Sequence, residues 1–244
     1  MYLLLDSNVT AGYYLPRSLD SRKAQQRIEN IFQSIRSGKS DHFLYIPNFC
    51  VAEVFSVFMK HAFGNWNPHV TKKGGTIDKR VYEKLVAQFQ EDIHNGKFIY
   101  HLELNRYHIL GINLVAPIDH SYKISKGKKN VTPCGTFDHL IISMGITLSH
   151  IHGRNNVCIV SADDRLTDLL SKCSSLNKPA KIKKLKLDIA KEVIGRPFSK
   201  ELFPKCINLK TAKISELIAV FGRWPLEVGS VPDHYRLLKG RGRS

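Results

Sequence analysis

The stretch "YLLLDSN" at residues 2–8 passes from an apolar run directly into a carboxylate, and it gives the clearest sign of the fold. Its apolar residues do not alternate with polar ones, which is typical of a parallel strand covered on both faces. Residues 157–164, "VCIVSADD", repeat the pattern. In open parallel sheets, ligands bind beyond the carboxyl ends of the strands. Asp6 and the Asp163–Asp164 pair are therefore predicted to lie at one functional edge.

Short apolar runs alternate with helical segments along the rest of the chain. We expect strands at 2–5, 43–47, 97–104, 155–161 and 206–209, with helices at 22–38, 48–63, 79–96, near 105–116, 136–150, 163–173 and 213–222. Asn48 and Thr136 are the expected N-caps of two of these helices. Strands separated by helices predict a three-layer α/β/α fold with a central parallel sheet of about five strands.

The length of 244 residues fits one large domain with additions. We expect the main domain at 1–210, with insertions near 64–96 and 118–135 that have loop-like or basic sequences. A C-terminal helix and a basic tail are expected at 211–244. No internal repeat and no clear linker divide the chain.

The chain is strongly basic, with 37 Lys plus Arg against 21 Asp plus Glu and a formal net charge of +16. Nucleic acid is the commonest polyanion that such a charge attracts, although an acidic membrane surface or a merely solvated surface is the alternative. Lysine patches just before residue 136 and in the loop after residue 64 are the predicted substrate-binding groups: Lys123, Lys126, Lys128, Lys129, Lys72 and Lys73. A further lysine-rich stretch covers 178–191.

The sequence favours a reducing, cytoplasmic setting without membrane attachment. The number of cysteines is 5, which is odd, and none forms a CxxC pair, so a zinc site and a disulfide framework are not expected. The apolar run before Asp6 is shorter than a signal peptide core and follows no basic segment. No stretch approaches the roughly 20 apolar residues of a membrane span.

Each acidic candidate has an ordinary structural explanation when it is taken alone. Glu53 is the single charge between Asn48 and Met59, and it could simply face solvent. Asp138 in the first turn of an apolar helix complements the helix dipole. Asp6 and one member of the Asp163–Asp164 pair could cap the segments that follow them.

The joint pattern points to metal chemistry more strongly than any single acid does. Carboxylates at strand ends and on apolar helices would repel one another and raise their pKa values unless a cation lay among them. Oxygen ligands suit Mg²⁺ or Mn²⁺. Such ions activate water and stabilise an in-line displacement at phosphorus.

These motifs, in this order, resemble the PIN-domain ribonucleases. "DSN" matches an Asp that closes the first strand, and "IPNFCVAEVFSVF" matches the following helix with its Glu53. "TFDHLIIS" matches the central motif with Asp138, and "VCIVSADDRL" matches the last, with Asp163 in register and Asp164 extra.

The resemblance implies a Mg²⁺- or Mn²⁺-dependent endoribonuclease. It implies that Asp6, Glu53, Asp138 and Asp163, with Asp164 beside them, are the catalytic and metal-binding acids. Asn8 and Ser161 would orient Asp6 and its neighbours. Many members, including the toxins of toxin–antitoxin pairs, are about half this length, so the toxin role, an inhibitory antitoxin-like partner and a homodimer stay open.

Other protein classes share some of these sequence features. A phosphatase of the haloacid-dehalogenase type needs a second Asp two residues after the first, where this chain has Asn8. A receiver domain needs an acidic pair on the first strand, which is missing. A non-catalytic RNA-binding or scaffold module with the PIN fold is the remaining alternative.

Overall fold

The computed structural model describes residues 1–16, 22–64, 77–96, 98–126 and 133–230, and of residues 22, 95 and 122–126 only the backbone. One five-stranded parallel sheet has the order β3-β2-β1-β4-β5. The strands are β1 (Tyr2–Leu5), β2 (Phe43–Pro47), β3 (Ile99–Leu102), β4 (Val157–Ser161) and β5 (Lys205–Asn208). The prediction of an α/β protein with about five parallel strands is confirmed, and the order is consistent with a PIN-like fold.

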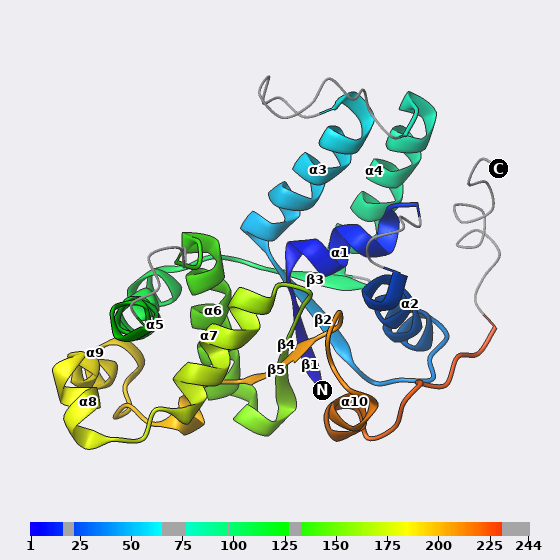
Figure 1. Cartoon of the computed structure of the whole chain (residues 1–244). Coiled ribbons are helices and arrows are strands. Elements are labelled where there is room, and N and C mark those ends of the chain that lie inside the picture. Colours follow the sequence, from blue (N-terminus) through cyan, green and yellow to red (C-terminus); the bar gives the residue numbers. More distant parts are fainter. Residues whose placement is uncertain (17–21, 65–76, 97, 127–132, 231–244) are drawn as a thin grey trace.

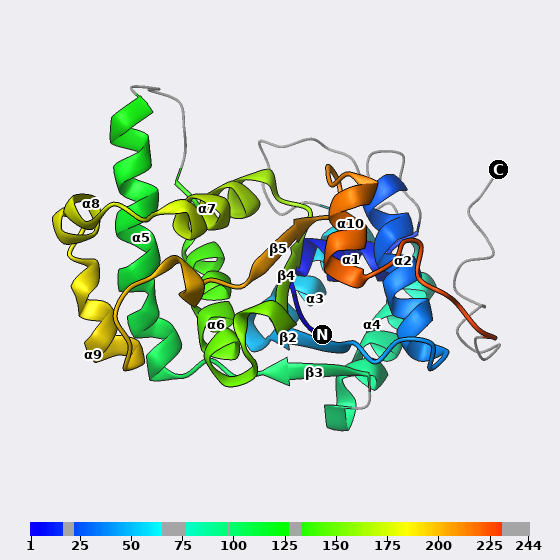
Figure 2. The same cartoon turned by 90° about the horizontal axis from the view of Figure 1, so that it is seen from below.

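Helices cover both sides of the sheet (Figure 1). The α-helices are α1 (Ser7–Tyr14), α2 (Arg22–Arg36), α3 (Asn48–Phe63), α4 (Lys79–Ile93), α5 (Arg106–Lys126), α6 (Thr136–His152), α7 (Asp164–Ser175), α8 (Pro179–Lys184), α9 (Ala190–Ile194) and α10 (Ile214–Phe221). Helices α5 to α7 lie on one side, α1, α2 and α10 lie on the other, and α3 and α4 project past the edge where the strands end. Figure 2 shows β3 and β5 at opposite borders of the sheet.

The first strand forms the centre of the core, as its apolar sequence predicts. Leu3, Leu4 and Leu5 are fully buried between β2 and β4. Helix α6 packs closely on β4 because Gly145 has no side chain: a Cβ there would lie 2.9 Å from Ile159 Cδ1. Close packing on this side brings the first turn of α6 toward the carboxyl ends of β1 and β4.

Two helices differ from the sequence prediction. Helix α1 was not predicted, since Val9, Thr10 and Gly12 are poor helix formers, but it buries Val9, Ala11, Tyr13 and Tyr14. Helix α5 continues to Lys126, so residues 118–126 of the expected loop 118–135 are helical, with Pro117 inside the helix. Tertiary packing overrides local propensity in both, because α1 packs against α2 and α3, and α5 packs against α6.

Both predicted N-caps are wrong by one residue. The N-cap of α3 is Pro47, so Asn48 is already helical, and no side chain caps this end. The N-cap of α6 is Gly135, and Asp138 supplies the cap by accepting a hydrogen bond of 2.8 Å from the Gly135 N–H. A carboxylate three residues into a helix reaches back to the N-cap backbone in this way.

The C-terminal segment adds to the same core. Leu217 and Phe221 of α10 are buried, and the Arg27 guanidinium donates 2.8 Å hydrogen bonds to the carbonyls of Leu209 and Ala212. The lysine-rich stretch 178–191 forms α8, a 3₁₀ turn and α9. The boundary proposed at residue 210 stays a prediction. Within the described ranges, no helix is both long enough and apolar enough to cross a membrane.

Candidate active site at the carboxyl edge of the sheet

The path of the chain across the sheet changes direction at β1. Open α/β sheets form their ligand sites at such a switch point. The chain passes from β1 outward to β2 and β3, and then returns to β4 on the other side of β1. The Asp6 N–H donates a 3.0 Å hydrogen bond to the Val160 carbonyl, so β1 and β4 end together. Asp6 and Ser161 therefore become neighbours although 155 positions separate them.

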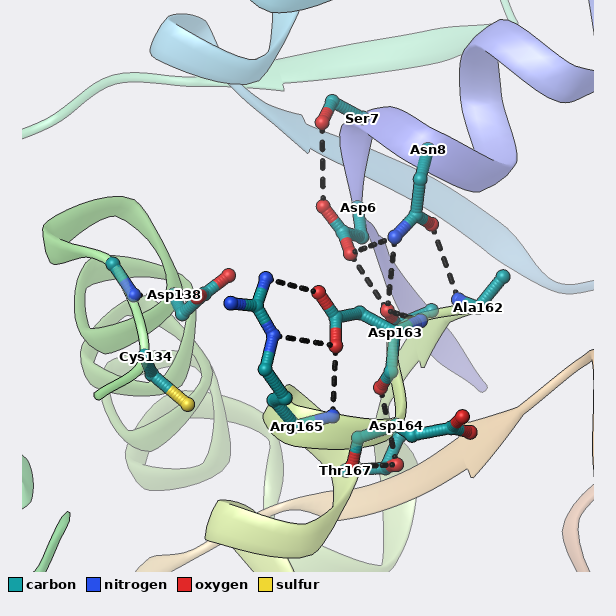
Figure 3. Close-up of polar contacts among 12 residues, drawn as sticks. Asp6, Ser7, Asn8, Cys134, Asp138, Ala162, Asp163, Asp164, Arg165 and Thr167 are labelled. Atoms are coloured by element: carbon teal, nitrogen blue, oxygen red, sulfur yellow. Dashed lines mark hydrogen bonds and ion pairs between the residues drawn. The ribbon is translucent and has the colours of Figure 1, made fainter. Parts of the chain in front are cut away.

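Asp6 is a buried carboxylate held by side-chain donors. It is 5% exposed. The Ser161 Oγ and Asn8 Nδ2 donate to its Oδ2 at 2.6 and 2.8 Å, and the Ser7 Oγ donates to its Oδ1 at 3.4 Å. These donors fix the carboxylate orientation, as Figure 3 shows for Ser7 and Asn8.

The side chains of Asn8 and Ser161 also connect the turns that follow β1 and β4. The Ala162 N–H donates to Asn8 Oδ1 at 3.1 Å, and the Asp163 N–H donates to Ser161 Oγ at 2.9 Å. Asn8 and Ser161 therefore position the backbone that carries Asp163 as well as the side chain of Asp6.

The pKa of Asp6 is raised from its ordinary range to about 6, first by burial and then by the negative charges of Asp138 and Glu53. The hydrogen bonds from Ser161 and Ser7 lower this pKa and offset part of the rise. A raised pKa at a buried carboxyl group marks a place where negative charge lacks compensation.

Glu53 joins this group from α3. It lies in the second turn of a helix that follows β2 without a loop, and its side chain is half-buried. Burial, Asp6 and Glu53, in that order, raise the pKa of the Cys50 thiol, which lies one turn earlier on the same helix. Glu53 therefore faces Asp6 and is not simply an exposed charge on an outer helix surface.

Asp138 reaches the edge from the first turn of α6. Burial raises its pKa, the hydrogen bond from the Gly135 N–H lowers it, and the charge of Asp163 raises it again. The helix-capping explanation and the site explanation both hold for this residue, because the group that caps α6 is also coupled to the other acids.

Arg165 is a cation inside the acidic group that the sequence did not single out. Asp163 caps α7 by accepting a 2.7 Å hydrogen bond from the Arg165 N–H. The Arg165 Nη2 donates to Asp163 Oδ2 at 2.9 Å. Burial raises the pKa of Asp163, but the hydrogen bonds and charge of Arg165 outweigh burial and lower it overall. Figure 3 shows the guanidinium between Asp163 and Asp138.

The two adjacent acids after β4 point in different directions. Asp164 is exposed, turns toward β5 and accepts a 2.8 Å hydrogen bond from Asn208 Nδ2. Figure 3 shows its carboxylate directed away from Asp6 and Asp138. Asp163 is therefore the member of the pair on the side of the other acids.

The donor chemistry at this edge suits Mg²⁺ or Mn²⁺, although the arrangement is not closed around an ion. Asp6, Glu53, Asp138 and Asp163 offer only oxygen, and burial leaves Asp6 and Asp138 with raised pKa values. Among the described residues, no three His, Cys, Asp or Glu side chains gather closely enough to hold a metal ion. The acids fit an ion by chemistry and location, and Arg165 currently balances one of them.

A cavity of about 630 Å³ opens beside Asp163 and Arg165. Its wall is formed by α1, α2 and α3, and it includes Asn8, His61 and Lys210. The cavity gives an extended ligand access to the carboxyl edge from the side of α1.

Some predicted binding residues lie outside the described structure, and one group lies elsewhere. Residues 72–73 and 128–129 are not described, and Lys123 and Lys126 lie in α5 where only the backbone is described. Within 178–191, three lysines line a separate cavity of about 810 Å³ beside α5: Lys181, Lys184 and Lys186.

Besides Arg165, the sequence did not predict that Asp119 is the partner of His139. The His139 Nε2 lies 3.0 Å from Asp119 Oδ2, and the Cys134 N–H donates to the same oxygen at 3.0 Å. This contact ties the start of α6 to α5. Of these two contacts, the sequence offered a signal only for the one between Arg165 and Asp163, which are two residues apart.

Comparisons with known proteins find a distant structural similarity. No family model matches the sequence, and no curated protein matches it. Among solved structures, the chain is similar to the crystal structure of VapBC2 from Rickettsia felis bound to a DNA fragment from their promoter. The similarity has a TM-score of 0.41 and 14% sequence identity, and covers 69% of this chain and 93% of that chain.

Proposed function

We propose that this protein is a divalent-metal-dependent endoribonuclease that hydrolyses RNA phosphodiester bonds at the carboxyl edge of its sheet. The observation that carries the proposal is the environment of Asp6. This buried carboxyl group has a pKa of about 6 because of burial and the charges of Asp138 and Glu53. Negative charge is concentrated there in a chain whose formal net charge is +16. A cation that binds among the acids would balance that charge, and the basic surface would attract RNA.

Asp6, Glu53, Asp138 and Asp163 would hold the metal ion. Bound Mg²⁺ or Mn²⁺ supplies an activated water and stabilises charge during in-line displacement at phosphorus. The chain keeps Asp6 oriented through Ser161 and Asn8. Asp164 is assigned no direct role, because its carboxylate binds Asn208.

The decisive experiment incubates the full chain with single-stranded and structured RNA in Mg²⁺, in Mn²⁺ and in chelator. We expect cleavage with either ion and none with chelator. Asp138→Asn should reduce the cleavage rate at least about 100-fold, because it removes a charged ligand at the reacting centre. Asp188→Asn, an exposed acid in the 3₁₀ turn between α8 and α9, is the matched control and should cut at the wild-type rate. Equal cleavage by wild type and Asp138→Asn would show that the proposed site is wrong.

A non-catalytic RNA-binding module is the second candidate, and Arg165 favours it. Its guanidinium occupies the space between Asp163 and Asp138 and neutralises Asp163 (Figure 3). If this internal cation substitutes for a metal ion permanently, RNA would bind without being cut.

Metal binding separates the two candidates. We expect Mn²⁺ to bind the wild-type chain in calorimetry, and to bind Arg165→Ala about tenfold more tightly because the competing cation is gone. Arg154→Ala, which removes an ion pair with Glu201 away from the acids, is the control. Absence of Mn²⁺ binding by every variant, together with intact RNA binding, would select the non-catalytic module.

A further inference from the structure

One face of the sheet is only partly covered. Helix α6 packs against β4 and β1 on that face. Parallel register places Phe43 beside Tyr2, and Tyr45 beside Tyr100, on the same side of the sheet. Phe43 is 45% exposed and Tyr100 is 41% exposed. Tyr2 and Tyr45 are partly exposed, and β3, which carries Tyr100, forms the border of the sheet (Figure 2).

The rings on β1, β2 and β3 form one continuous surface, which we call the aromatic face: Tyr2, Phe43, Tyr45 and Tyr100. Tyr2 stacks on Phe43 with ring centroids 5.4 Å apart and on Tyr45 at 6.0 Å. Tyr100 lies 6.3 Å from Phe43 and 6.0 Å from Tyr45. Burial, with Tyr2 and Tyr100 nearby, raises the pKa of Tyr45.

Backbone and side-chain contacts hold these rings in place. A Cβ on Gly96 would lie 2.7 Å from the Tyr100 ring, so the ring rests directly on the Gly96 backbone, which has φ of +61°. The His152 ring at the end of α6 stacks on Tyr2 with centroids 3.7 Å apart. A preformed ring surface loses little conformational entropy when a flat ligand stacks on it.

A second pair of rings lies on the helices that carry two of the acids. Phe49 of α3 and Phe137 of α6 stack with centroids 5.0 Å apart, and Phe137 is 48% exposed. Phe137 directly precedes Asp138, and Phe49 lies one helical turn before Glu53. Tyr2 begins β1 and Asp6 directly follows the strand, so the four-residue separation corresponds to roughly 13 Å. Exposed rings therefore mark both the far part of the sheet face and the edge that carries the acids.

We propose that the aromatic face binds unpaired bases of single-stranded RNA and leads the strand toward the carboxyl edge. The inference rests on the proposed function and names its substrate class. Aromatic rings stack on bases of any sequence, whereas paired bases in a duplex are not available to them. The surface consists of rings rather than aliphatic side chains. With a formal net charge of +16, the chain complements a polyanion and repels a second copy of itself.

The test measures binding of the full chain to a fluorescent single-stranded oligonucleotide by anisotropy in chelator, where nothing is cut. The variant carries Phe43→Leu and Tyr100→Leu together, which removes the rings and keeps apolar side chains. We expect its Kd for single-stranded RNA to rise at least about tenfold, with the Kd for a duplex of the same sequence unchanged. Ultraviolet crosslinking and mass spectrometry of the wild type should find RNA attached to peptides containing residues of the aromatic face.

Phe63→Leu is the matched control, because Phe63 is an exposed ring at the far end of α3. It should bind single-stranded RNA as the wild type does, and circular dichroism should show that both variants are folded. Unchanged single-strand affinity in the double variant would overturn the inference. A dimeric wild type and a monomeric double variant with the same RNA affinity would also overturn it, because the aromatic face would then serve self-association. Failure of metal-dependent cleavage alone would count against the proposed function and leave this binding result unaffected.

Discussion

At the scale of single residues, the arrangement around Asp6 shows how a buried charge is kept in place. Ser161 is completely buried and makes one hydrogen bond to the Asp6 carboxylate and another to the Asp163 backbone. Asn8 makes a similar pair of contacts to Asp6 and to Ala162. Small polar side chains therefore orient the Asp6 carboxylate and position the backbone that carries Asp163.

Removing the Ser161 hydroxyl should destabilise the protein measurably. Ser161→Ala leaves the Asp6 carboxylate with one donor fewer and the Asp163 N–H without its acceptor. We expect the free energy of unfolding to fall by about 1–3 kcal/mol, which is the usual cost of unsatisfied buried polar groups. Urea unfolding at neutral pH measures it. Ser175→Ala, which removes an exposed hydroxyl bonded to the Lys172 carbonyl, should change it by less than about 0.5 kcal/mol.

The raised pKa of Asp6 predicts how stability changes with pH in the metal-free protein. Its pKa of about 6 in the folded state exceeds the ordinary value near 3.9 of an unfolded chain. Between these values the folded state holds the proton more tightly, so stability falls as pH rises from 4 to 6 and stays lower above 6. The loss from this group is on the order of 3 kcal/mol.

Comparison with Asp6→Asn isolates this contribution. Urea unfolding in chelator at pH 4, 5, 6 and 7 should show the wild type losing stability relative to Asp6→Asn as pH rises. A constant difference between the two proteins across this range would mean that Asp6 has an ordinary pKa in the folded state.

At the scale of secondary-structure elements, close crossings place the acids. Helix α3 starts immediately after β2, so Glu53 stands a fixed distance from the sheet edge. Helices α5 and α6 cross where Gly111 faces Ser143, whose Oγ donates a 2.6 Å hydrogen bond to the His108 carbonyl. This crossing fixes α6, and with it Asp138.

Gly111→Ala should separate α5 from α6. A Cβ on Gly111 would lie 2.0 Å from Ser143 Oγ, so a helix has to shift or the hydroxyl has to turn away from His108. We expect a loss of about 1–3 kcal/mol in the free energy of unfolding. The loss should be smaller when Ser143→Ala is already present, because the remaining Cβ contact is 3.2 Å.

Gly12→Ala provides the comparison for that experiment. It also places Ala inside a helix, but nothing lies within 4 Å of the added Cβ. Its stability should stay unchanged or rise by up to about 1 kcal/mol, in line with helix propensity. If Gly111→Ala behaved in the same way, the crossing would not be sterically limited.

At the scale of the whole molecule, the positive charge that would attract RNA is distinct from the acidic group proposed to cut it. The chain carries a formal net charge of +16, while the acids gather at one edge of the sheet. Basic groups bind phosphates without reading sequence, and stacking on the aromatic face adds a term that does not depend on salt.

Salt should therefore weaken RNA binding steeply. With about five phosphates neutralised, the affinity for single-stranded RNA should fall about 100-fold between 50 and 200 mM salt. Anisotropy titrations in chelator measure the slope of log K against log salt. The Phe43→Leu and Tyr100→Leu chain should show the same slope at lower affinity. A flat salt response in the wild type would contradict the electrostatic part of the interaction.

The sequence alone determined the class of fold and the order of its main elements. Uninterrupted apolar runs at 2–5 and 157–160 indicated buried parallel strands, and the structure has β1 and β4 there. Helix 48–63 was predicted with its observed bounds. These features follow from local periodicity, which the chain carries regardless of its neighbours.

Only the tertiary structure decided which side chains meet. Local pattern could not show that α1 forms, that Asp163 rather than Asp164 acts on Asp138, or that Arg165 lies between Asp163 and Asp138. It could not show that rings from three strands lie side by side in one partly exposed surface. Each of these depends on strand order and register, which bring distant residues together through long-range packing that local propensity does not encode.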